Sequence, residues 1–289
     1  MKKKIIYLLF IFVILFSCSG CIKSDVMQGI DIVTTIYPID YITNRLYGDD
    51  SNITSIYPKG TIVNEYKLTN KMLRDYSEKD LFIYNGNTNE KEYAKDMLGF
   101  NRNLKIIDAS YGIDSTYKDS DVWLNPSNIL MVAQNIRNEL SEYINSSVVI
   151  DSINNKYDLL KVDITELESE IKKAAESSNL PTIVVYDESL NYLNKYGFKV
   201  INLTENGKTK QSNIDVAGDL YNNKKISYVF VIENEKISDD IEAFIKKYDV
   251  EKLTIRALDN IKEEDIANND DYLSLMHYNL DLIKKETYK

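Results

Sequence analysis

Histidine, cysteine, proline and glycine are all scarce in this sequence of 289 residues, which contains one His, two Cys, four Pro and ten Gly. With His277 as the only histidine, the chain cannot build the histidine-rich sites that zinc prefers. Both cysteines, Cys18 and Cys21, precede the main body of the chain, so that body can contain no disulfide. Catalysis that couples a nucleophile to a histidine base also lacks its parts.

Basic residues are outnumbered, with 35 Lys and Arg against 45 Asp and Glu, which gives a formal net charge of −10. Residues 1–20 contain three lysines and no acid, so their removal would change this charge to −13. Such an acidic body argues against nucleic acid or an anionic membrane surface as a partner. The segment "ENGKTK" contains one glycine and lacks the spacing of a phosphate-binding loop. We expect a binding protein and no enzyme.

The first 21 residues have the features of an export signal. Three lysines precede an apolar run from Ile5 to Phe16, which is too short to span a bilayer comfortably. The segment then ends in "SCSGC", which resembles a bacterial lipobox, where a cysteine is acylated and becomes the new N-terminus. We expect the lipid on Cys21, with Cys18 as the second choice and an uncleaved anchor as the alternative. The sequence therefore predicts an extracytoplasmic, lipid-anchored protein.

Two sets of short apolar runs predict two α/β lobes. The first set is "DIVTTIYPID", "SNITSIYPKG", "DLFIYNGN" and "LKIIDAS", with helical segments at 66–76 and 90–98. The second set is "TIVVYDESL", "KVINL", "SYVFVIEN" and "KLTIRAL", with helical segments at 190–196, 214–221 and 237–248. Runs without strict alternation are typical of strands buried on both faces of a parallel sheet. The alternation of strands and helices indicates βαβ units.

Between the two sets, no Gly or Pro occurs from Ser127 to Leu180. An apolar stripe in this stretch fits one face of a helix of about 26 residues, roughly 39 Å long. The stripe consists of Ile153, Tyr157, Leu160, Ile164, Leu167, Ile171 and Ala174. One interpretation is the seam of a coiled-coil dimer. We favour a rigid strut that joins the two lobes of a monomer.

Together, a lipoprotein signal, two α/β lobes and one long helix resemble the zinc and manganese solute-binding lipoproteins of ABC importers. Collinear motifs carry the resemblance: "IVTTIYPIDYITNRLYGDDSNITSIYPKGTIVNEYKLT", "DLFIYNGNTNE", "DVWLNPSNI" and "DDYLSLMHYNLDLIKK". The resemblance implies two lobes, each with a four-stranded parallel sheet, a ligand cleft between them, and an ABC permease as partner. The predicted divisions are a signal peptide (1–20), a tether (21–30), an N-terminal lobe (31–145), a connecting helix (146–179) and a C-terminal lobe (180–289).

The resemblance also implies four metal-ligand positions, and none of them is occupied by histidine here. In the family a divalent ion is held by two His, by a His or Glu, and by an Asp or Glu. The matching residues are Asn64 in "IVNEYK", Asp121 in "DVWLNP", Asp187 in "VVYDESL" and Asp259 in "RALDN". Glu65 and Glu188 are adjacent candidates, whereas His277 lies where the family places no ligand. Oxygen donors suit Mn²⁺, Mg²⁺ or Ca²⁺ better than Zn²⁺.

A second interpretation of these positions involves no metal. Asn and Asp are common in turns and at helix N-termini, where their side chains accept hydrogen bonds from backbone N–H groups. Asp187 follows an apolar run and precedes a helical segment, as a cap would, and Asn125 precedes Pro126 in the same way. Two hypotheses therefore stand: a cation site rebuilt from oxygen ligands, or a binding or adhesion lipoprotein that keeps the scaffold without the metal.

Overall fold

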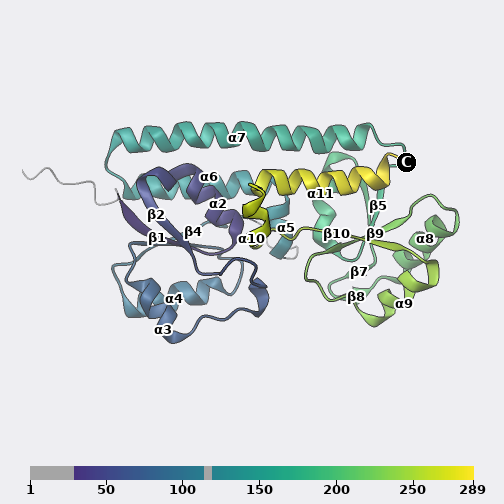
Figure 1. Ribbon diagram of the computed structural model, residues 1–289, viewed down its shortest axis with the longest axis horizontal. Helices are drawn as coiled ribbons and strands as arrows, with labels where there is room; N and C mark the ends of the chain where they lie inside the picture. Colours follow the sequence, from purple (N-terminus) through teal and green to yellow (C-terminus); the bar gives the residue numbers. More distant parts are fainter. Residues whose placement is uncertain (1–28, 114–118) are drawn as a thin grey trace, which may run out of the picture.

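The computed structural model describes residues 29–113 and 119–289, without the side chains of residues 119–121. The predicted signal peptide, nearly all of the tether, and both Cys18 and Cys21 lie outside the described residues. Within the described ranges, no helix is long and apolar enough to cross a membrane. The structure therefore concerns the two lobes and the helix between them (Figure 1).

The N-terminal lobe contains a four-stranded parallel sheet with the strand order β2-β1-β3-β4. Its strands are β1 (Ile30–Thr34), β2 (Ser51–Ser55), β3 (Leu81–Tyr84) and β4 (Lys105–Asp108). All four residues of β3 are buried, as expected for a central strand covered on both faces. These strands lie in the four apolar runs from which they were predicted, except that β1 begins one residue earlier, at Ile30.

In the part of this lobe that the structure describes, five helices accompany the sheet. They are α2 (Tyr37–Tyr47), α3 (Asn70–Ser77), α4 (Glu90–Phe100), α5 (Asp119–Leu124) and α6 (Pro126–Tyr143), with short 3₁₀ turns at Gly48–Asp50 and Val63–Glu65. Helix α3 begins four residues later than the predicted start at Tyr66. The reason is a cap, because the Thr69 hydroxyl accepts a hydrogen bond from the Met72 amide at 3.3 Å.

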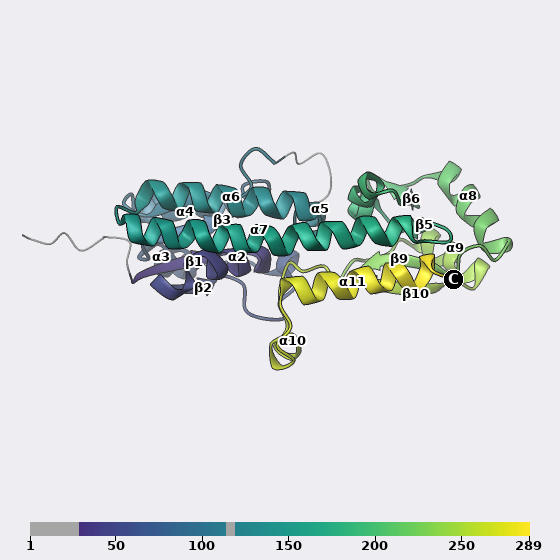
Figure 2. The ribbon, with the colours of Figure 1, turned by 90° about the horizontal axis from the view of Figure 1, so that it is seen from above.

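Helix α7 (Ser147–Glu176) is 30 residues long and lies along both lobes (Figures 1 and 2). The Ser146 side chain caps its N-terminus by accepting from the Val149 amide. All seven residues of the predicted apolar stripe are buried, with at most 7% of any of them exposed. They pack against α2 and α6 of the first lobe and against α11 (Tyr272–Thr287). The stripe is therefore covered within one chain, as the strut interpretation requires.

The C-terminal lobe repeats the topology of the first, with the order β10-β9-β5-β6 and all strands parallel. Its strands are β5 (Thr182–Val185), β6 (Lys199–Asn202), β9 (Tyr228–Ile232) and β10 (Glu251–Ile255). Besides α11, its described helices are η3 (Glu188–Tyr196), α8 (Gln211–Asn222), α9 (Asp239–Tyr248) and α10 (Glu263–Ala267). The segment η3, predicted as an ordinary helix, is a 3₁₀ helix with a kink at Leu190. An antiparallel hairpin, β7 (Thr204–Glu205) with β8 (Lys208–Thr209), was not predicted.

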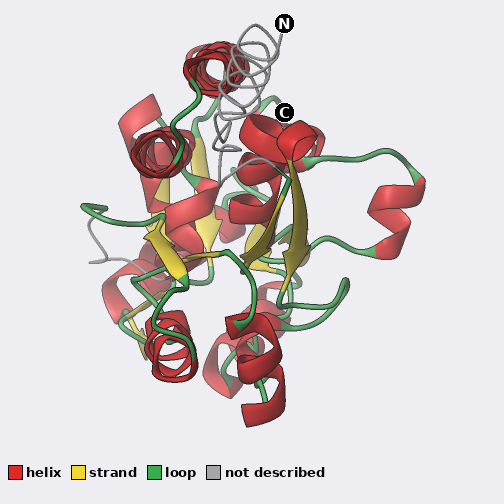
Figure 3. Ribbon diagram, turned by 90° about the vertical axis from the view of Figure 1, so that its left-hand side faces the viewer, coloured by secondary structure: helices red, strands yellow, loops and turns green. Residues whose placement is uncertain are grey.

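One apolar core runs through both lobes. It includes Ile32 of β1, Leu167 of α7, Phe230 of β9 and Ile283 of α11, all with at most 2% of the residue exposed. A smaller core fills the other face of the second sheet, under α8 and α9. The end-on view in Figure 3 shows the strands enclosed between helices. The sheets and α7 thus hold the two lobes at a fixed separation, with loops from both lobes facing each other.

Candidate functional site

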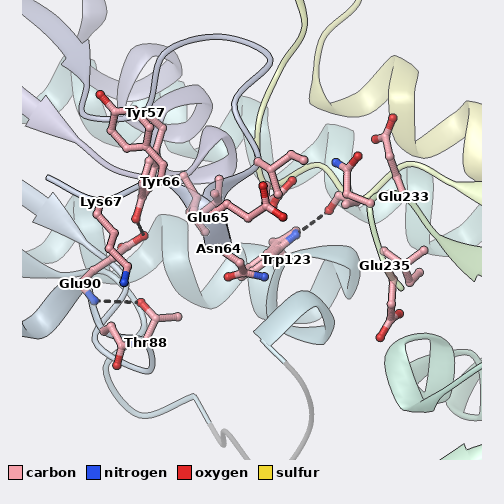
Figure 4. Close-up of a pocket in the computed structure, with 18 of the residues that line it drawn as sticks. Tyr57, Asn64, Glu65, Tyr66, Lys67, Thr88, Glu90, Trp123, Glu233 and Glu235 are labelled. Atoms are coloured by element: carbon pink, nitrogen blue, oxygen red, sulfur yellow. Dashed lines mark hydrogen bonds between the residues drawn. The ribbon is translucent and has the colours of Figure 1, made fainter. Parts of the chain in front are cut away.

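A cavity of about 540 Å³ lies between the lobes, where loops follow the carboxyl ends of the parallel strands. The first lobe contributes residues 62–67, residues 88–90 and Trp123 of α5. The second lobe contributes the last residue of β9 and the three that follow it (232–235), together with Ala257 and Asp259 after β10. Figure 4 shows Glu65 on one side of the cavity and Glu233 and Glu235 on the other. The structure therefore has a cavity at the predicted position of the ligand cleft.

Hydrogen bonds between the lobes fix one side of this cavity. The Trp123 indole Nε1 donates to the Ala257 carbonyl at 2.7 Å (Figure 4). The Trp123 carbonyl in turn accepts from the buried Tyr272 hydroxyl at 2.6 Å. The Tyr37 amide donates to the Asp259 carbonyl at 2.9 Å. Because each bond joins one lobe to the other, the segment that carries Asp259 is held against the first lobe.

Asp259 is a partly buried carboxyl on the cavity wall. Burial raises its pKa to about 6, and the negative charge of Glu233 adds to this effect, while hydrogen bonds from backbone amides, that of Asn260 first, act in the opposite direction. A cation beside Asp259 would favour its charged form. The site thus contains a carboxylate that a positive ligand would stabilise.

Glu233 differs because positive charges already surround it. Its carboxylate lies 2.5 Å from the Lys262 ammonium and 3.0 Å from the Arg256 guanidinium, and Arg256 also forms two hydrogen bonds with Asp265. Burial alone would raise the pKa of Glu233, but the bonds to Lys262 and Arg256 lower it below its usual value. Glu233 is therefore neutralised by the protein itself.

The opposite wall contains the buried carboxyl of Glu90, which is 3% exposed. One of its oxygens accepts from the Tyr57 hydroxyl at 3.1 Å, and the other accepts from the Asn85 amide at 2.8 Å. Burial, together with the charge of Glu90, raises the pKa of Tyr57, so this phenol stays protonated. Glu90 thus orients an aromatic side chain of the wall.

The structure brings two of the four predicted ligand residues to this cavity. Asn64 is exposed on the 3₁₀ turn of the first lobe, and Asp259 lies on the second lobe. Asp187 is fully buried and does not line the cavity; its carboxylate caps η3 by accepting from the Ser189 amide at 2.8 Å. Asp121 lies in the first turn of α5, and its side chain is outside the described part of the chain.

The capping interpretation is confirmed at a further position. The Asn125 side chain accepts from the Ser127 amide at 3.1 Å and caps α6, with Pro126 in the first turn. His277 lies on α11, 3.2 Å from the Glu170 carboxylate of α7, and both side chains are more than 40% exposed. It is thus a half-exposed side chain on the surface of the molecule.

No ready-made metal centre is visible in the part of the chain that the structure describes. Among those side chains, no three His, Cys, Asp or Glu residues lie close enough together to hold one ion. The sequence reasoning missed Glu235, Lys67 and the aromatic wall of Tyr57, Tyr66 and Tyr93. Glu235 lies three residues after the run "SYVFVI", so its position just beyond the end of a strand was the available signal.

The protein family described as "ZnuA: Zinc-uptake complex component A periplasmic" matches residues 32–286 of this sequence. The chain belongs to this family. Among ZnuA-family relatives, the zinc-binding lipoprotein AdcA of Streptococcus pneumoniae strain R6 is 24% identical over 304 residues, which cover 94% of this chain and 58% of AdcA. The chain thus spans less than two thirds of AdcA. The metal ABC transporter substrate-binding lipoprotein ScbA of Streptococcus cristatus is 27% identical, with 96% of each chain covered.

Solved structures show the same ZnuA-like fold. The Zn(II)-bound ZnuA-like domain of Streptococcus pneumoniae AdcA superimposes with a TM-score of 0.72 at 21% identity, covering 90% of this chain and 100% of that domain. The metal-dependent lipoprotein YcdH of Bacillus subtilis gives a TM-score of 0.74 at 17% identity, with 90% and 100% covered. The predicted fold of two lobes with parallel four-stranded sheets is confirmed.

Proposed function

We propose that this protein is an extracytoplasmic solute-binding lipoprotein that captures a divalent cation between its lobes and delivers it to an ABC permease. Membership of the zinc-uptake family and the full-length match to ScbA support this function. The observation that carries it is the cavity itself, because Asn64 and Asp259 face it from opposite lobes. A ligand bound there would contact both lobes at once.

We further propose that the cation is Mn²⁺, Ca²⁺ or Mg²⁺ rather than Zn²⁺, with Asn64, Asp121, Asp187 and Asp259 as its ligands. All four residues offer oxygen, which hard cations prefer. The raised pKa of Asp259 supports the idea, since this carboxyl would gain from a nearby positive charge. Asp187 is the weakest member of the set, because one of its oxygens already caps η3.

Titration calorimetry and thermal melts of chelator-treated protein test this proposal. A cation that binds only the folded state stabilises it by about 2.7 kcal/mol at one hundred times Kd, so we expect Mn²⁺, Ca²⁺ or Mg²⁺ to raise Tm more than Zn²⁺ does. Asp259→Ala should abolish the shift without unfolding the protein. The matched control is Glu166→Gln on the exposed face of α7. Absence of heat and of any shift at millimolar ion would refute cation capture.

The second candidate is a binding or adhesion lipoprotein that has lost metal binding. It is favoured by the absence, among the described side chains, of three ligands grouped around one point. The laminin-binding protein Lmb of Streptococcus agalactiae, described as a bifunctional protein with adhesin and metal transporting activity, has this fold with a TM-score of 0.71 at 19% identity, covering 89% of this chain and 99% of Lmb. Under this hypothesis none of the four ions changes Tm.

Both candidates require membrane attachment, which we propose occurs through lipid on Cys21. Labelled palmitate should be incorporated into the wild-type protein and lost in Cys21→Ser. The matched variant is Cys18→Ser, which should keep the label. If Cys18→Ser loses the label instead, the acylated residue is Cys18; if the wild-type protein takes up none, the protein is not a lipoprotein.

A further inference from the structure

A loop of the first lobe, residues 56–69, reaches the second lobe beside the cavity. It joins β2 to α3 and carries Asn64 on the cavity wall (Figure 4). At its tip, the Gly60 amide donates a hydrogen bond to the Ile261 carbonyl at 2.9 Å. Ile261 lies two residues after Asp259, the cavity carboxyl of the second lobe. The loop that bears one candidate ligand thus contacts the segment that bears another.

The Asn260 side chain holds this loop at two further points. Its Nδ2 donates to the Pro58 carbonyl at 2.8 Å and to the Thr61 carbonyl at 3.0 Å. Its Oδ1 accepts from the Ile261 amide at 2.8 Å. A primary amide has two N–H donors and one carbonyl acceptor, whereas aspartate has no donor and serine has only one. Asparagine is therefore the residue type that this contact requires.

The residues around Asn260 are fixed within the second lobe. Arg256 forms two hydrogen bonds with Asp265 of α10, at 2.9 and 2.7 Å, and Asp265 also accepts from the Lys262 amide at 2.9 Å. The Lys262 ammonium in turn pairs with Glu233. The side chains of Arg256, Asp265 and Glu233 are at most 15% exposed. The Asn260 segment is thus anchored in the second lobe, and its bonds to the loop cross from that lobe to the first.

We propose that Asn260 is a positioning residue, which holds loop 56–69 against the second lobe and thereby fixes Asn64 relative to Asp259 across the cavity. An ordered loop favours binding, because the ligand does not have to order it. This role rests on the proposed function in one respect, namely that a cation is captured between Asn64 and Asp259. The contact itself can be tested without any cation.

Amide hydrogen exchange of the mature chain, followed by NMR without added metal, tests the contact. Asn260→Ala removes both donors and should speed exchange of the Gly60 amide about tenfold, since loss of two neutral hydrogen bonds favours local opening by about that factor. Exchange at Phe82, in the central strand β3, should not change. The matched control is Asn223→Ala, which removes an amide that donates to a carbonyl of α8 and should leave Gly60 as it is. Unchanged exchange at Gly60, or equal acceleration at Gly60 and Phe82, would overturn the proposal.

A variant of the same size separates the donors of Asn260 from its acceptor. Asn260→Asp keeps an oxygen for the Ile261 amide but has no N–H to donate. It should therefore speed exchange at Gly60 as much as Asn260→Ala does. Exchange at the wild-type rate in Asn260→Asp would show that the bonds to the loop do not hold it, and the proposal would be wrong.

Titration with Mn²⁺, Ca²⁺ and Mg²⁺ connects the contact with ligand capture. Asn260→Ala should weaken binding of the ion that the wild type takes up about tenfold, because the loop must then be ordered during binding, while Asn223→Ala should keep the wild-type Kd. An unchanged Kd in Asn260→Ala, despite faster exchange at Gly60, would reject the positioning role. If the wild-type protein takes up no ion, cation capture is refuted, and exchange at Gly60 still decides whether Asn260 holds the loop.

Discussion

Single residues decide how this scaffold differs from the metal binders that it resembles. The Asp187 side chain, at a predicted metal-ligand position, caps a helix, and capping also explains the presence of Asn125. Asp259 is different, because it lines the cavity and its pKa is raised to about 6. A carboxyl whose pKa is raised by burial costs stability when it ionises in the empty protein, and a positive ligand beside it would relieve this cost.

This cost predicts a pH dependence of the free energy of unfolding. Between the unfolded pKa of about 3.9 and the folded pKa of about 6, the folded state binds more protons than the unfolded state, so Asp259 lowers stability as pH rises through this window. Asp259→Asn should remove that slope and stabilise the ligand-free protein at pH 7 by on the order of 2 to 3 kcal/mol. Urea denaturation from pH 4 to 8 measures it, with Asp158→Asn as the exposed control. A variant less stable than the wild type at pH 7 would contradict the argument.

At the scale of elements, α7 carries the connection between the lobes. The apolar stripe of α7 could be predicted because a long helix with one buried face leaves a clear repeat of apolar residues in the sequence. The kinked 3₁₀ helix η3 and the two-residue strands of the hairpin leave almost no pattern, since few residues repeat. The late start of α3 depends on one hydroxyl, that of Thr69. The layers of the fold could thus be predicted from the sequence, whereas the cap at Thr69 and the short elements required the structure.

The candidate site was predictable in part, for a related reason. The family resemblance pointed to Asp259, and this residue does line the cavity, because residues that follow parallel strands gather at one edge of the sheet. Asp187 also follows a strand, but its side chain turns back to cap η3. The sequence does not show which way a side chain at the end of a strand points. The tyrosines that line the cavity come from separate segments of the chain. The sequence therefore does not show that they lie together, and only the structure does.

The buried face of α7 can be tested against its exposed face. Leu167 is fully buried in the core that runs through both lobes, whereas Leu159 of the same helix is 64% exposed. Leu167→Ala should destabilise the protein by about 2 to 5 kcal/mol because it leaves a cavity, while Leu159→Ala should change stability by less than about 0.5 kcal/mol. Chemical denaturation provides both values. Equal small effects, accompanied by dissociation of a dimer in Leu167→Ala, would support a coiled-coil seam.

At the scale of the whole molecule, the two lobes share one core and are joined directly across the cavity by Trp123 and Tyr272. A protein divided into independent domains would have separate cores and would unfold in steps. Here the second, smaller core lies on the outer face of the C-terminal sheet. Any part of the protein that unfolds separately should therefore lie within the second lobe, and the two lobes should not unfold independently of each other.

Calorimetry distinguishes these arrangements. We expect one thermal transition whose calorimetric and van't Hoff enthalpies agree, because melting either lobe exposes the core shared through α7. Tyr272→Phe leaves the buried Trp123 carbonyl without its donor and should lower stability by about 1 to 3 kcal/mol while the transition remains single. The exposed control is Tyr278→Phe, on the same helix and 50% exposed, which should change little. Two resolved transitions, with only one of them shifted by Tyr272→Phe, would show that the lobes unfold independently and that α7 is a linker, not a shared structural element.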